Sequence, residues 1–172
     1  MEHLGQIMHK SFFDRCATAL EQGFYMEAIL MEYAAIESRL EVFLGLLNLP
    51  CNRNIADKER RKVQISHRIK CAKECLGNFE IFNTSKLDKK YFDRLSKWIK
   101  KRDEYVHGLY KNEIMYETRI AGAKEHAEKG EELCRLLYNE VNRLKRLRKT
   151  HPEVSVECVV CNESRCCLNN RK

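Results

Sequence analysis

The chain has 172 residues, of which 44% are hydrophobic and 33% charged, a balance that excludes an intrinsically disordered protein and allows one domain a real core. Its formal net charge of +7 fits a polyanionic partner but does not determine the fold. No apolar run is long enough to span a bilayer, and the N-terminus lacks the layout of a signal peptide. We therefore expect a cytoplasmic protein without a membrane partner, whose 9 cysteines are reduced thiols.

The composition favours helices, because only 2 prolines and 7 glycines interrupt a chain rich in Glu, Lys, Leu and Arg. The sequence predicts an all-α protein, a helical bundle of about five helices over residues 1–150. In chain order, the expected helices cover Lys10–Gln22, Phe24–Leu49, Ala56–Leu76, Leu87–Tyr110 and Glu113–Lys149. The last one is followed by His151-Pro152, which ends it.

The second helix has the clearest apolar stripe. At about 100° per residue, six side chains fall on one face: Ile29, Tyr33, Ile36, Leu40, Phe43 and Leu47. Glu32 and Glu37 flank this stripe on opposite edges, so either carboxylate could reach a neighbouring helix.

The fourth helix carries a cation on its apolar face. Arg102 projects within about 20° of the centre of a stripe formed by Tyr91, Leu95, Trp98, Ile99, Val106 and Leu109. A charge buried there costs several kcal/mol unless a partner compensates it. Two interpretations follow: a structural ion pair with Glu32 or Glu37, or an accessible interface where the planar guanidinium grips a phosphate.

His107 follows Arg102 by five residues, which places it about 140° around the helix and roughly 7.5 Å along it. The two side chains therefore cannot share one face of a single straight helix. Asp103 and His107 are spaced i and i+4 and can meet. A carboxylate beside an imidazole fixes its tautomer and raises its basicity, as a general base requires.

The segment "RDEYVH", Arg102 to His107, resembles the R-x4-6-H signature of the HEPN superfamily, in which a polar residue commonly follows the arginine. The resemblance covers roughly residues 10–149 and implies a helical bundle with the signature on a late helix. It further implies a metal-independent endoribonuclease without a cofactor, acting as a toxin, in antiviral defence or in RNA processing. The family role of the catalytic arginine and histidine would fall on Arg102 and His107, and the polar position on Asp103.

The same resemblance implies a homodimer whose two signature helices face each other, with the catalytic residues of both copies lining one cleft. It also implies a neutralising protein or a nucleotidyltransferase-type partner. In such a site His107 would move a proton and Arg102 would neutralise charge on the phosphorane, while the RNA supplies its own 2′-hydroxyl as nucleophile. Lys97, Lys100 and Lys101 adjoin the motif and are the cations expected to contact RNA phosphates.

Two alternatives stay open. The chain could be a non-catalytic HEPN-like helical module that binds a protein partner or nucleotide and uses Arg102 only for structure, because fold does not fix function. The tail, residues 151–172, contains Cys158, Cys161, Cys166 and Cys167. Four thiolates suffice for tetrahedral zinc, but the usual second C-x2-C pair is missing, so a flexible reduced tail is the preferred interpretation.

Overall fold

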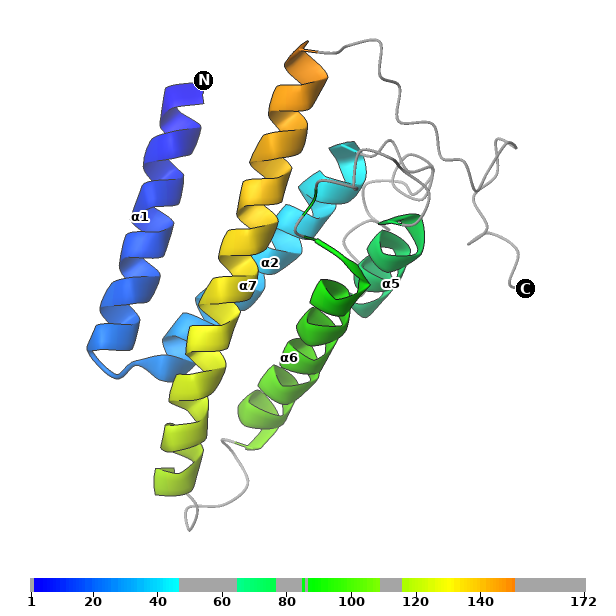
Figure 1. The fold of residues 1–172 in the computed structure, drawn as a ribbon. Helices are drawn as coiled ribbons and strands as arrows, with labels where there is room; N and C mark the ends of the chain where they lie inside the picture. Colours follow the sequence, from blue (N-terminus) through cyan, green and yellow to red (C-terminus); the bar gives the residue numbers. More distant parts are fainter. Residues whose placement is uncertain (1, 47–64, 77–84, 86, 109–115, 151–172) are drawn as a thin grey trace, which may run out of the picture. The chain divides into compact units, whose positions relative to one another are not determined.

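The structure, a computed structural model, describes residues 2–46, 65–76, 85, 87–108 and 116–150. Within these residues the chain forms five α-helices and no strand (Figure 1), which confirms the all-α prediction. In chain order the helices are α1 (Glu2–Glu21), α2 (Tyr25–Leu46), α5 (Ile65–Cys75), α6 (Lys89–Gly108) and α7 (Tyr116–Thr150). The cysteine-containing tail and the predicted start of the third helix lie outside the described residues.

The helix boundaries follow the sequence closely, with one larger difference. Helix α1 begins at Glu2, eight residues before the predicted start at Lys10. No proline interrupts the segment before Lys10, and the structure continues the helix through it. Helix α7 extends unbroken over 35 residues, as the long fifth helix was expected to do.

The turn between α1 and α2 depends on Gly23, which has a φ of 79°. Its amide donates to the carbonyl of Leu20 at 3.2 Å, and the amide of Phe24 donates to the carbonyl of Ala19 at 2.8 Å. This pair of bonds is a Schellman motif, which needs a left-handed residue that glycine adopts without steric cost. The predicted break at Gly23 is confirmed.

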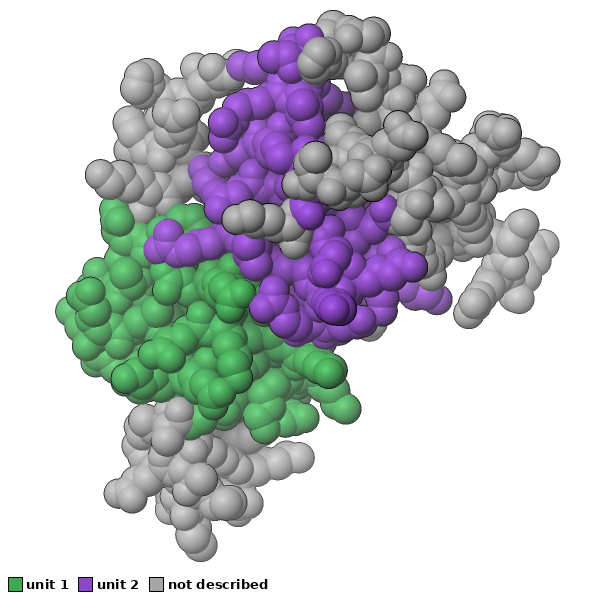
Figure 2. Space-filling model, viewed as in Figure 1, with its two compact units in different colours: residues 1–36, 97–134 green, residues 37–96, 135–172 purple. Residues whose placement is uncertain are grey.

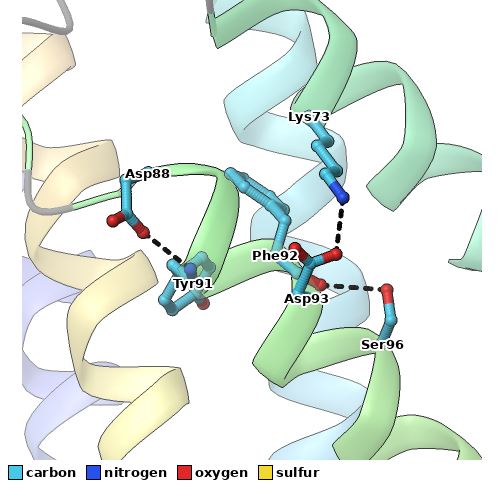
Figure 3. A network of polar contacts seen from close by, with 6 residues as sticks. All are labelled: Lys73, Asp88, Tyr91, Phe92, Asp93 and Ser96. Carbon is cyan, nitrogen blue, oxygen red and sulfur yellow. Dashed lines mark hydrogen bonds and ion pairs between the residues drawn. The ribbon is translucent and has the colours of Figure 1, made fainter.

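The start of α6 is fixed by an acidic cap and by a contact with α5 (Figure 3). The amide of Tyr91 donates to Oδ1 of Asp88 at 2.7 Å, and the amide of Phe92 donates to the Asp88 carbonyl at 3.3 Å. One turn later, Nζ of Lys73 lies 2.5 Å from Oδ1 of Asp93. Asp88 therefore acts as the N-cap, satisfying amides that the first turn cannot pair internally.

The chain divides into two compact units, coloured separately in Figure 2. Unit 1 comprises Met1–Ile36 and Lys97–Cys134, and unit 2 comprises Glu37–Ser96 and Arg135–Lys172. Buried apolar side chains in unit 1 include Cys16, Ile29, Ile36, Trp98, Ile99, Ala127 and Leu133; those in unit 2 include Leu40, Phe43, Leu87, Tyr91, Phe92, Leu95, Leu137 and Val141. The apolar stripes predicted for the second and fourth helices are thus confirmed wherever their members are described, except that Tyr33 and Val106 are only half-buried. A single domain over residues 1–150 stays a prediction.

A search of the described helices for a membrane-crossing segment finds none that is both long enough and apolar enough.

Candidate functional site

The candidate residues of the "RDEYVH" motif all lie on the C-terminal half of α6, within unit 1. Lys97, Lys100, Lys101 and His107 are exposed, whereas Arg102 and Asp103 are half-buried. The helix ends at Gly108, immediately after the histidine. The motif therefore occupies the last two turns of a well-defined helix.

Arg102 is held by two contacts of different kinds. Its Nη1 donates to Oδ1 of Asp103 at 2.7 Å, and its guanidinium carbon lies 3.8 Å from the centre of the Tyr33 ring on α2. The Arg102 side chain retains 19% exposure and that of Asp103 47%. The face of the cation is covered by an aromatic ring and one edge is paired with a carboxylate, so the charge is compensated at a partly accessible position.

The glutamates considered as partners of Arg102 are placed elsewhere. Among the described residues, neither carboxyl oxygen of Glu32 has a hydrogen-bond partner, and the ion pair of Arg102 is with Asp103 rather than with Glu32 or Glu37. The backbone carbonyl of Glu37 instead accepts from Nη1 of Arg68 at 3.4 Å. The expectation that Glu32 or Glu37 pairs with Arg102 is therefore corrected. The acidic partner is Asp103, whose carboxylate lies on the same helix within reach of the guanidinium.

His107 projects into solvent in the last turn of α6. Asp103, one turn earlier, is bonded to Arg102, and no hydrogen bond or ion pair between Asp103 and His107 is described. The carboxylate of Asp103 thus pairs with the guanidinium of Arg102 instead of making the expected contact with the His107 imidazole.

Arg102 and His107 point in different directions from the helix. The former lies against α2 and the latter is exposed, as the angular separation of about 140° requires. A single chain therefore does not direct both side chains at one phosphate.

Lys101 is the basic neighbour with the most contacts. Its Nζ lies 2.9 Å from Oε2 of Glu104 and 5.4 Å from the centre of the Tyr105 ring. The hydrogen bond and charge of Glu104 raise the pKa of Lys101, and the same bond lowers the pKa of the Glu104 carboxyl. The charge of Lys101 is thus shared with an acid, whereas Lys97 and Lys100 are exposed cations beside the motif.

A buried polar cluster lies in the same unit and was not identified from the sequence. Nε1 of Trp98 donates to the backbone carbonyl of His126 at 2.8 Å, and the two rings stack at 5.0 Å with an interplanar angle of 8°. The ring of Tyr105 lies 5.2 Å from that of His126. Burial, with the charges of Lys101 and Lys129, lowers the pKa of His126 to about 4, so the imidazole is neutral at pH 7.

Glu32, expected at the edge of the α2 stripe, lies instead in the interior of this unit. Its side chain is fully buried, and burial, assisted by the charge of Glu131, raises its pKa to about 9. Helical periodicity could have predicted this burial, since Glu32 lies only about 20° around α2 from Phe43, a member of the apolar stripe. Gly130 makes room for the carboxyl, because a Cβ at that position would collide with Oε2 of Glu32 and come within 2.6 Å of the Trp98 ring.

Metal binding has no candidate among the described residues, where no group of three or more His, Cys, Asp or Glu side chains is arranged to hold an ion. Cys158, Cys161, Cys166 and Cys167 lie outside the described residues. Cys16, Cys71 and Cys134 are buried among apolar side chains, where a thiol packs as a small hydrophobe.

Comparison of the chain with family models, curated proteins and solved structures gave no match in any of the three.

Proposed function

We propose that the chain is a metal-independent endoribonuclease of HEPN type, with Arg102 and His107 as its catalytic residues. The observation that carries this proposal is the state of Arg102 on α6. Its guanidinium is compensated by Asp103 and Tyr33, keeps 19% exposure, and is not sealed in an ion pair with a core glutamate. An arginine restrained in this way retains donors for a phosphate.

The chemistry follows from the residue types. His107 takes the proton from a ribose 2′-hydroxyl, and the resulting oxyanion attacks the adjacent phosphorus. The bond from phosphorus to the 5′-oxygen then breaks, and that oxygen receives a proton from an imidazolium. Arg102 neutralises the charge that builds on the phosphorane oxygens, usually the larger contribution to the rate. The products are a 2′,3′-cyclic phosphate and a 5′-hydroxyl, and DNA, lacking the 2′-hydroxyl, resists cleavage.

The proposed site is composite. Because Arg102 and His107 diverge on one helix, the arginine of one chain acts with the histidine of a second copy in a homodimer. Lys97 and Lys100, with Lys101, contribute salt-sensitive contacts to the RNA backbone. Asp103 keeps the polar position of the motif and holds the guanidinium.

The test is cleavage of a labelled single-stranded RNA in EDTA. We expect metal-independent cleavage by the wild type and at least about a hundredfold loss of kcat/KM in both His107→Ala and Arg102→Ala, the scale of removing a general base or a charge-stabilising group. His67→Ala is the matched control, since His67 is an exposed histidine on α5 in the other unit. Cleavage that survives in both site variants would exclude this site.

A second candidate is the non-catalytic helical module that binds a protein partner or nucleotide. The observation that favours it is that Arg102 is four-fifths buried and compensated within its own chain. A purely structural Arg102 predicts an inert wild type. It also predicts that Arg102→Ala lowers the free energy of unfolding by about 1–2 kcal/mol, the loss of a half-exposed ion pair and a cation–π contact.

A further inference from the structure

We propose that Tyr33 is a positioning residue for Arg102: its ring fixes the guanidinium in the orientation that meets the scissile phosphate. This inference rests on the proposed function of the Arg102 site. It concerns a residue on α2 that lies outside the "RDEYVH" motif and that the motif does not require.

The argument begins with the flexibility of arginine. An unrestrained arginine loses up to about 2 kcal/mol of rotamer entropy when it is ordered, so a site that needs one orientation must hold the guanidinium in advance. Asp103 is adjacent in sequence and accepts a hydrogen bond from Nη1 of the cation. That bond restrains the cation only relative to its own helix, α6.

Tyr33 supplies the restraint that Asp103 cannot. It belongs to α2, and its ring centre lies 3.8 Å from the guanidinium carbon, in face contact with the cation. Buried Ile29 and Ile36, one turn before and after it, anchor this part of α2 in the core of unit 1. A tyrosine ring has only two side-chain torsions, so the anchor is stiff.

The two contacts leave hydrogen-bonding capacity on the cation. Asp103 takes a donor of Nη1 and the ring takes a face, while Nε is buried and has no hydrogen-bond partner among the described residues. The donors left for a phosphate are therefore those at the Nη end of a side chain that keeps 19% exposure. A cation held through one edge and one face, with further donors unused, is suited to binding the oxygens of a phosphate.

The test compares three residues at position 33 in the EDTA cleavage assay. Tyr33→Phe keeps the ring and removes the hydroxyl, and we expect kcat within about threefold of wild type. Tyr33→Leu removes the ring, and we expect kcat to fall about ten- to a hundredfold, as for a displaced catalytic group, with a smaller change in KM. Pentafluorophenylalanine in place of Tyr33 keeps the shape of phenylalanine but reverses the charge of the ring face. It should therefore behave like leucine even if the leucine variant folds poorly.

Action through Arg102 is tested by a double-mutant cycle. In the Arg102→Ala background, Tyr33→Leu should change the rate by less than about twofold, because the group that it positions is already absent. The NMR chemical shift of the Arg102 Nε–H is a readout that does not depend on activity. The ring current at position 33 should displace this shift in wild type and in Tyr33→Phe, but not in Tyr33→Leu.

Either of two results would overturn the role of Tyr33 but leave the proposed function standing. One is that Tyr33→Leu cleaves at the wild-type rate while Arg102→Ala is slow. The other is that Tyr33→Phe loses as much rate as Tyr33→Leu. A wild type that does not cleave, or an Arg102→Ala variant as fast as wild type, overturns the proposed function and this inference with it.

Discussion

Arg102 shows how single contacts decide what a charged residue on an apolar stripe becomes. Its position in the stripe follows from helical periodicity, but its compensation comes from a neighbouring aspartate and from an aromatic ring on another helix. A half-exposed ion pair contributes up to about 1 kcal/mol and a cation–π contact a similar amount. These modest energies hold the guanidinium without sealing it in the core.

Glu32 is the residue whose chemistry burial changes most. The fully buried carboxyl has no hydrogen-bond partner in the part of the chain that the structure describes, and burial raises its pKa from 4.5 to about 9. The folded protein therefore keeps a proton that the unfolded chain releases above pH 4.5. By linkage, this group's contribution to stability is complete below pH 4.5 and is lost progressively as the pH rises towards 9.

We expect Glu32→Gln to be increasingly more stable than the wild type as the pH rises from 5 to 8. Glutamine has nearly the same shape but binds no proton, so the difference in the free energy of unfolding should grow by about 1.4 kcal/mol per pH unit. Urea unfolding of both proteins at several pH values measures it.

The control for this prediction is Glu27→Gln, the same substitution at an exposed position of α2. The lowered pKa of His126 makes the folded protein less stable below about pH 6.5, but this effect is common to all three proteins and cancels. A difference between Glu32→Gln and wild type that stays constant over this range would show that Glu32 is ionised in the folded protein.

At the scale of the element, α6 depends on its first turn as well as on its apolar stripe. The predicted start at Leu87 and the observed start at Lys89 differ because Asp88 accepts the amide of Tyr91 and remains outside the helix as its cap. This cap fixes where the helix begins, and hence which residues of α6 face the core.

We expect Asp88→Ala to lower the free energy of unfolding by about 1 kcal/mol, the usual loss when an N-cap is removed. Asp88→Asn should stay within a few tenths of a kcal/mol of wild type, because an asparagine side-chain oxygen accepts the same amide. Urea midpoints at pH 7 distinguish the two. If asparagine is as damaging as alanine, the charge of Asp88 rather than its hydrogen bond stabilises the helix end.

Helix α7 illustrates an exception to helix propensity. Gly130 costs about 1 kcal/mol relative to alanine in a helix interior, yet the helix continues through it to Thr150. The reason is tertiary, since a Cβ there would collide with the Glu32 carboxyl and press on the Trp98 ring.

At the scale of the whole molecule, the proposed site requires two chains, and complementation between inactive variants tests it. Mixing Arg102→Ala with His107→Ala under conditions that exchange subunits creates heterodimers in which one of the two sites has both catalytic residues intact. We expect recovery of about a quarter of the wild-type rate, since half of the dimers are mixed and each has one working site. RNA cleavage by the mixture, compared with each variant alone, measures it.

The control is a mixture of His107→Ala with the double variant Arg102→Ala/His107→Ala, which contains no intact histidine and should not recover. A mixture of the two single variants that stays inactive after subunit exchange would contradict a site shared between chains.

The sequence by itself determined the helical character of the chain and most helix boundaries. Apolar residues at helical spacing, with few prolines and glycines, are local signals that every helix carries, and Gly23 alone was enough to predict the break between α1 and α2. The stripe on α6 also placed Arg102 among apolar neighbours and separated it from His107 by simple geometry.

Only the tertiary structure decided how the polar residues are partnered. Tyr33 meets Arg102, and Trp98 meets His126, across different helices, and Glu32 lost its charge because the core of unit 1 closes around it. Such pairings depend on which helix faces lie together at distances of a few ångströms, information that periodicity along one helix does not contain. Ionisation follows the same rule, because a pKa is set by desolvation and by neighbouring charges, and both exist only once the chain is folded.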